Sequence, residues 1–252
     1  MKILLSPAKS LNFKSVLPTK IHSEPCFLKE ANFLNSILKS KKPAEISELM
    51  HISSSLGELN YERFQEWSSS PNKEKARQAI YAFSGDVYKG LDSYNIENNK
   101  IDFMQNSIRI LSGHYGLLRP LDLIQPHRLE MGTKMSFKDY KNLYDYWKKQ
   151  VSLELNKELS KDEVVLNLAS NEYFKVIDPK VIDSPIYSAN FKQYRDGDFK
   201  TIAIYSKKAR GLMTRFIVDN KIDSIDDIKS FNYDGYIFHK DMSSDKDFVF
   251  TR

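Results

Sequence analysis

RILSGHYGLLRPLDLIQPHRLEMGT, residues 109–133, joins a short apolar run to a long polar segment. Its first three residues predict a strand, after which two glycines bracket a His-Tyr pair. Glycine permits positive φ and close backbone approach, so this part is typical of a shaped loop. The steps into Pro120 and Pro126 disfavour helix just before each proline. We therefore expect a loop of about 20 residues, a length that is often functional.

Three other apolar runs end in polar or basic loops in the same way: LSPAKS (5–10), LNLASNEYF (166–174) and IAIYSKKARG (202–211). In open α/β sheets, ligands bind beyond the carboxyl ends of the strands. If these strands lie side by side, their loops meet in one cleft. The polar and glycine residues that we expect to line it are Ser6, Lys9, Ser112, Gly113, His114, Tyr115, Arg119, Asn167, Ser170, Asn171, Glu172, Tyr173, Lys207, Lys208 and Arg210.

The spacing of apolar residues predicts the secondary structure. Helices are expected over 27–38, 44–50, 53–67, 72–83, 142–159, 212–218 and 226–229. Strands are expected over 2–5, 109–111, 164–168, 186–191, 201–205, 236–239 and 248–250. Ser53 or Ser54 and Asn72 are the expected N-caps of two helices. This order predicts a mixed α/β fold, with a central mixed β-sheet wrapped by helices, in a single compact domain over residues 1–252.

Composition narrows the class of protein. The chain has 252 residues, of which 41% are hydrophobic, and it has no linker or internal repeat, so we expect one domain with a sizeable core. No apolar run approaches the roughly 18 residues of a membrane span. The run before Pro7 is too short for a signal peptide, and a lone Cys26 excludes an internal disulfide. We expect a cytoplasmic protein with no membrane partner; the sequence does not indicate an oligomeric state.

Charge favours an anionic partner. The net charge is +5, and no acid occurs between Met1 and Ser23, between Asp102 and Asp122, or between Asp198 and Asp219. Any one such run is typical of a solvated surface, but three of them favour a basic rim. The candidate anion-binding residues are Lys9, Arg109, Arg119, Arg128, Lys207, Lys208 and Arg210. The run Lys207–Gly211 is the strongest candidate, because a helix N-terminus would add backbone N–H groups; the alternative is a solubilising surface turn.

The motifs of common enzymes are absent from the sequence. There is no Gly-x-Gly-x-x-Gly, P-loop, Gly-x-Ser-x-Gly, His-Glu-x-x-His or Cys-x-x-Cys, and the five histidines are scattered. We therefore predict no cofactor and no metal, although a carboxylate-built metal site cannot be read from spacing. The candidate catalytic residues are Glu172, Tyr115 and Asn171. Glu172 could be an acid or base, or equally a partner of the lysines, and Tyr115 and Tyr173 could stack on bases.

Several of these pieces occur together in one known family. They include ILLSPAKSLNF (3–13), LMHISSSLGELNYERF (49–64), ARQAIYAFSGDVYKGL (76–91), the stretch 109–133, NLYDYW (142–147), NLASNEYF (167–174), KKARGLMTRF (207–216) and DGYIF (234–238). Along its whole length the chain resembles the peroxide stress protein YaaA family. Small departures from the family pattern lie at Ser10, His114 and His127.

The resemblance implies a cytosolic protein that supports survival of hydrogen peroxide by lowering free intracellular iron. It also implies binding of double-stranded DNA, without sequence preference, through a positively charged cleft and a helix–hairpin–helix-like element. We place that hairpin at SGDVYKG (84–90), with Gly85, Asp86, Tyr88, Lys89 and Gly90. Such a hairpin would offer backbone N–H groups to phosphates.

Two other functions stay open. The cleft could belong to an enzyme that acts on a nucleobase, a nucleotide or damaged DNA, because a phosphate binder does not need the amides of Asn167 and Asn171 or the side chains of Glu172 and Tyr173. Direct iron sequestration is a third interpretation, for which cysteine and histidine are sparse. The sequence does not decide whether the protein is an enzyme.

Overall fold

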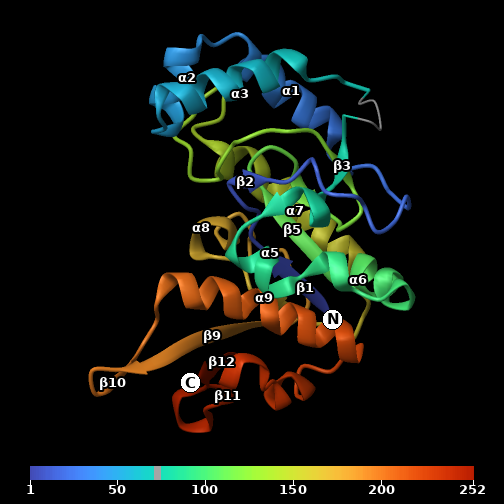
Figure 1. Cartoon of the computed structure of the whole chain (residues 1–252), viewed down its shortest axis with the longest axis vertical. Helices are drawn as coiled ribbons and strands as arrows, with labels where there is room; N and C mark the ends of the chain where they lie inside the picture. The colour runs from blue at the N-terminus through green and yellow to red at the C-terminus, as the bar shows by residue number, and fades with distance from the viewer. Residues whose placement is uncertain (71–74) are drawn as a thin grey trace.

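The computed structural model describes residues 1–70 and 75–252. Within them, an eight-stranded sheet has the order β11-β12-β9-β8-β1-β5-β6, with β10 paired to β9 (Figure 1). The strands are β1 (Lys2–Leu5), β5 (Ile108–Ser112), β6 (Gly116–Leu118), β8 (Val165–Asn167), β9 (Ile186–Arg195), β10 (Asp198–Lys200), β11 (Ile237–Phe238) and β12 (Asp247–Thr251).

Strand β1 lies in the middle of this sheet and is parallel to both neighbours. Leu4 is in register with Arg109 of β5 on one side and with Asn167 of β8 on the other. Strands β8, β9 and β12 continue the parallel arrangement, and antiparallel β6 and β11 close the two edges. The carboxyl ends of β1, β5 and β8 therefore meet at one edge. The predicted α/β class, with a central mixed sheet, is confirmed.

Helices cover both faces of the sheet, because successive strand residues point to opposite sides. Ile3 and Leu5 belong to one buried apolar cluster and Leu4 to another. Helices α4 (Ala79–Ala82), α5 (Asp86–Leu91), α6 (Ile101–Ser107) and α9 (Ala203–Asn220) contribute to the first cluster. The second draws on α1 (Leu28–Lys39), α2 (Pro43–Met50), α3 (Ser54–Glu66), α7 (Leu143–Glu158) and α8 (Asn171–Phe174).

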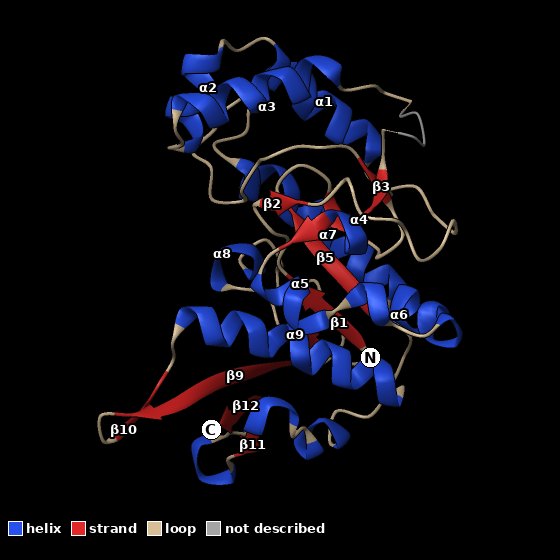
Figure 2. Ribbon diagram, viewed as in Figure 1, coloured by secondary structure: helices blue, strands red, loops and turns tan. Residues whose placement is uncertain are grey.

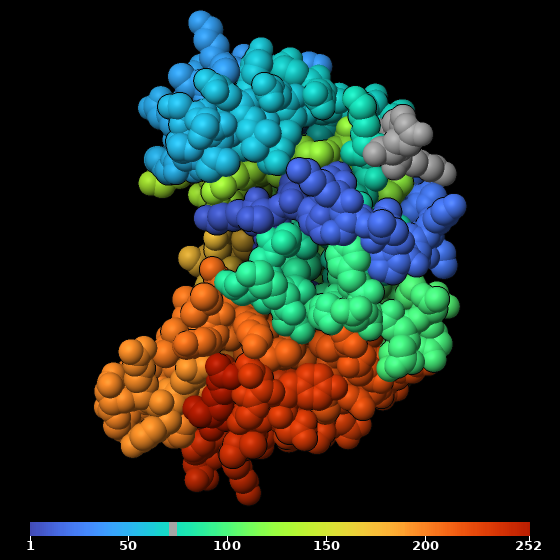
Figure 3. All heavy atoms as spheres, viewed as in Figure 1, coloured from blue at the N-terminus to red at the C-terminus, as the bar shows by residue number. Residues whose placement is uncertain are grey.

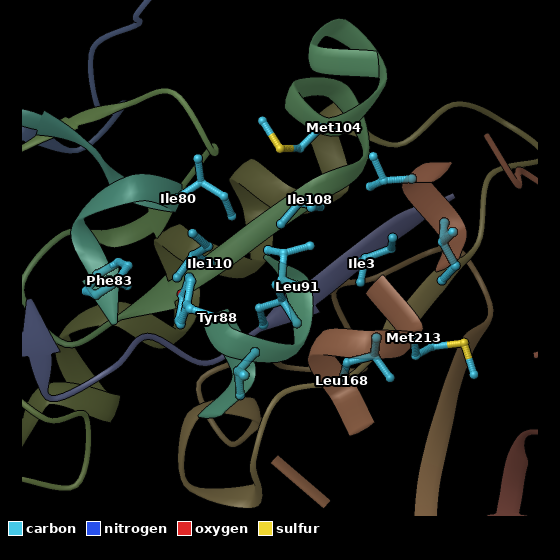
Figure 4. Close-up of a cluster of buried hydrophobic side chains, with 14 of the residues drawn as sticks. Ile3, Ile80, Phe83, Tyr88, Leu91, Met104, Ile108, Ile110, Leu168 and Met213 are labelled. Carbon is cyan, nitrogen blue, oxygen red and sulfur yellow. The ribbon is translucent and has the colours of Figure 1, made fainter. Parts of the chain in front are cut away.

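The first cluster joins strands, α5 and α9 into one core. Figure 4 shows Ile3, Ile108 and Ile110 of the sheet with Leu91 and Met213 of the helices. Each such side chain, when fully buried, stabilises the fold by about 1.5–3 kcal/mol. Figure 2 shows α5 and α9 crossing in front of the strands, and α1, α2 and α3 grouped at one end of the molecule. This packing holds α9 beside the carboxyl end of β1.

Four helices agree with the sequence prediction. Helices α1, α2, α3 and α7 lie where apolar spacing placed them. The side chain of Ser53 caps α3 by accepting a hydrogen bond from the Leu56 N–H, and Asn142 caps α7 through the Asp145 N–H. Pro43 occupies the first turn of α2, where its missing N–H costs nothing. None of the helices in the two described ranges is long and apolar enough to cross a membrane.

The strand predicted over 201–205 is wrong, because residues 203–205 begin helix α9. Ser206, Ala209 and Met213 are buried at helical spacing, while Ile204 and Tyr205 are exposed. The apolar run at 202–205 therefore does not reflect a buried strand. Packing of the following turns on α5 decides the conformation instead.

The helix predicted over 72–83 is confirmed only at Ala79–Ala82, which form α4, and is wrong at Arg77–Gln78 and Phe83. Residues 72–74, including the proposed cap Asn72, lie outside the described residues. Arg77–Gln78 forms β3, which pairs with β7 (Leu123–Ile124), and Phe83–Ser84 forms β4, which pairs with β2 (Ser10–Leu11). Stretch 109–133 thus contains β6 and β7 and is less irregular than predicted.

Short 3-10 turns complete the described chain. They are η1 (Ser93–Asn95), η2 (Asn98–Lys100), η3 (Asp227–Ser230), η4 (Tyr233–Gly235) and η5 (Lys240–Met242). Turn η3 lies where a short helix was predicted over 226–229.

Candidate functional site

A cavity of about 280 Å³, the main pocket, opens at the carboxyl ends of β1 and β8. Its wall comes from segments that are distant in sequence: the loop after β1, the start of α5, helix α8 and the first turns of α9. Figure 3 shows the surface hollowed at this place, where the dark-blue N-terminal segment lies between lime, gold and orange segments. The polar lining residues are Ser6, Lys9, Ser10, Ser84, Asp86, Tyr88, Glu130, Ser170, Glu172, Tyr173, Lys207 and Arg210.

Two further pockets adjoin the main pocket, and all three share Lys9 and Glu130. A small pocket of about 20 Å³ lies beside Ser112 and His127. An outer pocket of about 400 Å³ lies between the connection of α2 to α3 and residues 128–134. We call the three together the strand-end cleft.

The floor of the main pocket is held by hydrogen bonds between the ends of two strands. The Ser170 N–H donates to Ser6 Oγ at 2.9 Å, and the Tyr88 hydroxyl donates to the Ser6 carbonyl oxygen at 3.0 Å. Burial, together with the neighbouring Tyr173, raises the pKa of Tyr88 well above its ordinary value. Tyr88 is therefore a neutral, fixed donor at neutral pH.

Glu130 neutralises two of the cations in the cleft. One carboxylate oxygen lies 2.6 Å from Lys9 Nζ and the other lies 3.0 Å from an Arg128 guanidinium nitrogen. A carboxylate shared by two cations weakens the attraction of both for an outside anion. The cleft therefore contains both paired and unpaired positive charge.

Glu172 is fixed at the boundary between the main pocket and the outer pocket. Its Oε1 accepts a hydrogen bond from the Gly132 N–H at 3.0 Å, and its carbonyl oxygen accepts one from the Tyr144 hydroxyl at 2.8 Å. A Cβ on residue 132 would lie 3.0 Å from the same Oε1, so glycine permits this approach. A carboxylate held in this way can accept hydrogen bonds, or a proton, from a ligand.

Arg210 and Lys207 supply unpaired charge at the other side of the main pocket. Within residues 1–70 and 75–252, neither side chain forms an ion pair, and the buried Nε of Arg210 has no hydrogen-bond partner. Burial lowers the pKa of Arg210, because the charged form is poorly solvated. Lys208, by contrast, lies 3.3 Å from Asp234 and lines none of the three pockets.

Helices α2 and α3 form a tight helical hairpin beside the outer pocket. Residues 51–53 join them, and His51 has left-handed backbone with φ 51°. A side chain at Gly57 would overlap the Ser47 hydroxyl, so the two helices pack closely. His51 lines the outer pocket, which places the hairpin connection on the strand-end cleft.

Comparison with known proteins identifies the family. A family model described as peroxide stress protein YaaA matches residues 1–242. The chain belongs to the peroxide stress protein YaaA family. It is 53% identical to a UPF0246 protein of Flavobacterium johnsoniae and 50% identical to one of Flavobacterium psychrophilum, over the whole of each chain. A UPF0246 protein of Saccharophagus degradans is 47% identical over all of this chain and 99% of the relative.

The resemblance inferred from the sequence is thus confirmed, and a peroxide stress protein is what membership of the YaaA family supports. The structure brings together ten of the predicted site residues around the main pocket. They are Ser6, Lys9, Gly85, Asp86, Tyr88, Ser170, Glu172, Tyr173, Lys207 and Arg210. Whether these residues bind an anion or act on a substrate stays a prediction.

Apart from Ser112, which lines the small pocket, the first half of stretch 109–133 lies in the core of this YaaA-family protein and not in the cleft. His114 and Tyr115 are buried, and the Tyr115 hydroxyl accepts a hydrogen bond from the Gln125 N–H at 3.0 Å. The expectation that Tyr115 stacks on a base is therefore wrong. A side chain at Gly113 would overlap the Leu129 carbonyl, so that glycine serves close packing. The second half, residues 128–133, forms the cleft wall.

Two predicted rim arginines have other partners. Arg109 is buried and forms an ion pair with Glu158 of α7. Arg119 pairs with Asp122 at 3.1 Å and donates to the Glu24 carbonyl oxygen. Neither lines the strand-end cleft, so their placement there is corrected.

Two predicted amides also lie outside the cleft. Asn171 is exposed and lines none of the three pockets. Asn167 turns back to accept a hydrogen bond from the Ala169 N–H at 3.0 Å, and it is absent from the pocket walls as well. Short side chains of this kind often bond to nearby backbone.

The hairpin predicted at 84–90 is a helix. Ser84 ends β4 and Asp86–Leu91 is α5, where Lys89 pairs with Asp86 at 3.9 Å. Gly85 has an extended backbone, and Gly90 lies where α5 meets α9. The two glycines therefore do not form a turn, and residues 84–90 do not form the predicted hairpin.

Sequence reasoning missed Glu130 and His127 as cleft residues. Glu130 lies two positions after Arg128, and that spacing was the available signal. His127 lines the small pocket, and its Nδ1 lies 2.8 Å from the Gln125 carbonyl oxygen. That contact assigns the proton to Nδ1 and leaves Nε2 as an acceptor. Burial lowers the pKa of His127 to about 4, so the ring is neutral at neutral pH. In the described ranges, no group of three or more His, Cys, Asp or Glu side chains is placed to hold a metal ion.

Proposed function

We propose that this protein supports survival of hydrogen peroxide stress by binding double-stranded DNA in the strand-end cleft, without sequence preference, and by limiting free intracellular iron. Membership of the YaaA family supports the peroxide role. The DNA and iron parts rest on the resemblance and on the chemistry of the cleft.

One observation carries the DNA proposal: the cleft runs from the connection of the α2–α3 hairpin at His51 to the first turns of α9. Lys9, Arg128, Lys134, Lys207 and Arg210 line it, against the carboxylates of Asp86, Glu130 and Glu172. Among the residues described, Lys134, Lys207 and Arg210 form no ion pair. Unpaired cations along a concave surface attract phosphates and carry no sequence information.

Binding of this kind would protect DNA from iron, an effect separate from limiting free intracellular iron. DNA holds a layer of condensed cations, and a protein that neutralises phosphates releases them. Ferrous ions at the backbone would be released with the rest, so less iron would react with peroxide beside DNA. Strand breakage of a plasmid by ferrous iron and peroxide should therefore fall when the protein is added at low salt, and should return when salt dissociates the complex.

The test of DNA binding is fluorescence anisotropy with two unrelated 20-base-pair duplexes between 50 and 200 mM salt. We expect equal affinities for the two sequences and a logarithmic slope of about −0.9 per phosphate contacted. Replacing Lys134 and Lys207 together by Ala should weaken binding and flatten the slope. The matched control replaces Lys208 and Lys229, which pair with Asp234 and Asp226 away from the cleft. Salt-independent binding, or equal weakening by both double variants, would contradict the proposal.

A second candidate function is catalysis on a nucleobase, a nucleotide or damaged DNA. The fixed carboxylate of Glu172, which faces both the main pocket and the outer pocket, favours it. Mass spectrometry after incubation with nucleosides and damaged oligonucleotides tests it. Turnover that is lost in Glu172→Gln would support an enzyme; no turnover, with full peroxide resistance of the same variant in cells, would exclude this role for Glu172.

A further inference from the structure

We infer that the main pocket binds one nucleotide unit, with its phosphate on Arg210 and Lys207 and its sugar and base toward Tyr173, Glu130 and Glu172. This inference rests on the proposed function for one source of the ligand, a nucleotide turned out of a DNA strand. The other source, a free nucleoside monophosphate, presents the same chemistry.

Arg210 presents an unpaired guanidinium to the main pocket. Arg210 is largely buried and lines the main pocket, yet within the described residues it forms no ion pair and its Nε has no partner. Buried charges in folded proteins are otherwise paired, because leaving water without a partner costs free energy. The buried Nε is closed to a ligand, but Arg210 lines the open pocket, so a ligand anion there would pair with the charge of its guanidinium.

The anion that suits Arg210 and Lys207 together is a phosphate. Lys207 lies one turn before Arg210 on α9 and lines the same pocket. An arginine fork that binds two oxygens, with a lysine as a neighbouring point charge, suits a tetrahedral oxyanion that carries more than one negative oxygen. Hydroxyl groups of Ser10 and Ser84 line the same pocket and can donate to further oxygens.

The carboxylates that line the main pocket indicate the chemistry of the rest of the ligand. Glu130 and Glu172 line the same pocket, and ionised carboxylates only accept hydrogen bonds. A bare phosphate would be repelled by them, whereas sugar hydroxyls and exocyclic amines would donate to them. Burial raises the pKa of Tyr173, so its hydroxyl also stays neutral. A ligand with an anion at one end and donors at the other fits this polarity.

The volume of the main pocket limits the size of the ligand. The pocket volume of about 280 Å³ lies just below the range for small-molecule sites, roughly 300–1,000 Å³. A pocket of this size suits a small ligand such as one nucleotide. Proteins that act on single bases accept a nucleotide rotated out of the duplex, which is easiest at a mismatch or bulge.

Isothermal titration calorimetry of the full chain tests the inference. The probes are the four deoxynucleoside monophosphates, the matching nucleosides without phosphate, and inorganic phosphate. We expect the monophosphates to bind at least about tenfold more tightly than either fragment. Arg210→Gln should lose at least tenfold in affinity, and Lys207→Ala should weaken binding in the same direction. Lys208→Ala, one residue along the same helix, should bind as the unaltered protein does.

Unfolding of the ligand-free variants separates binding from folding. Removing an unpaired buried charge should leave the Tm of Arg210→Gln unchanged or raised, so lost binding there is not lost structure. Equal affinity for inorganic phosphate and monophosphates would overturn the nucleotide assignment. Failure of every probe, with salt-dependent duplex binding intact, would overturn this inference and leave the proposed function.

The two sources are distinguished with duplexes of identical sequence, one perfect and one with a single-nucleotide bulge. Tighter binding of the bulged duplex that disappears in Arg210→Gln supports a nucleotide turned out of the strand. Monophosphate binding without any duplex binding supports the free nucleotide and overturns the proposed function instead.

Discussion

Gly90 of α5 and Gly211 of α9 lie against each other's helix backbone. A Cβ on Gly211 would overlap the Val87 carbonyl oxygen and lie 2.7 Å from the Leu91 nitrogen, and one on Gly90 would lie 3.0 Å from the Leu212 nitrogen. The two helices therefore cross with no side chain between them. This crossing places Arg210 of α9 and Tyr88 of α5 in the wall of the same pocket.

Gly211→Ala should push α9 away from α5. Because the added methyl meets backbone atoms that cannot turn aside, we expect a loss of about 1–3 kcal/mol in the free energy of unfolding. The displacement should also weaken ligand binding at Arg210. Urea denaturation and the calorimetric titration measure the two effects. The control, Gly197→Ala, meets no atom within 4 Å but has φ +84°, so it should cost stability without changing binding.

Acid should destabilise the protein through His114 and His127, whose rings lie 5.0 Å apart. Burial and the neighbouring His127 lower the pKa of His114 well below its ordinary value, and burial lowers that of His127 to about 4. Above pH 6.5 both rings are neutral in the folded and unfolded states. Below pH 6.5 the two rings become protonated in the unfolded state but stay neutral in the folded state. The free energy of unfolding therefore falls by up to about 2.7 kcal/mol per pH unit for two rings.

Urea denaturation at pH 7.5, 6 and 5 measures this loss. Replacing His114 by Leu removes one of the two rings that take up a proton mainly in the unfolded state. The pH dependence of the free energy of unfolding should therefore become smaller by about 1.4 kcal/mol per pH unit. Replacing His51, whose side chain is exposed, is the control and should leave the slope unchanged. The same pH dependence in His114→Leu as in the unaltered chain would show that His114 does not carry the effect.

The long capped helices could be predicted from the sequence, because local chemistry decides them. Ser53 and Asn142 cap α3 and α7 through their own next turns, and the apolar spacing within each helix matches its buried face. The convergence of the loops after β1 and β8 was predictable for a similar reason, since parallel strands share a carboxyl edge.

The features of the fold and the site that could not be predicted depend on contacts between residues that are distant in the sequence. Residues 203–205 are an unbroken apolar run but join α9, because Gly90 and Gly211 permit the helix crossing. His114 and Tyr115 look like cleft residues in sequence, yet the β5–β6 turn carries them into the core. The sequence also could not show which cations are paired, because Asp234, the partner of Lys208, lies 26 residues away along the chain.

Cys26 should not serve as a peroxide-reactive thiol. Although the residue reaches the surface, its sulfur donates to the Leu117 carbonyl, and burial, with Asp122 next in effect, raises the pKa of Cys26 to about 12. Because the thiolate is the reactive form, the folded protein should react with a disulfide reagent slower by a factor on the order of a thousand than an ordinary thiol. The urea-unfolded chain is the control; equal rates in both states would contradict this prediction.

Glu130→Gln should strengthen DNA binding at low salt, because it releases Lys9 and Arg128 from their shared carboxylate. Each released cation that reaches a phosphate adds about −0.9 to the logarithmic salt slope, so the slope should steepen by about 1 to 2. Asp245→Asn, an exposed change away from the cleft, removes the same charge and serves as the control. An unchanged slope in Glu130→Gln would mean that the two cations do not face DNA.

The most direct test of the central claim is backbone hydrogen exchange with and without a 20-base-pair duplex at low salt. If the strand-end cleft binds DNA, exchange should slow in residues 6–10, in residues 128–134, in the α2–α3 connection and in the first turns of α9. Protection confined to the β9–β10 hairpin, or no protection at saturating duplex, would contradict the account.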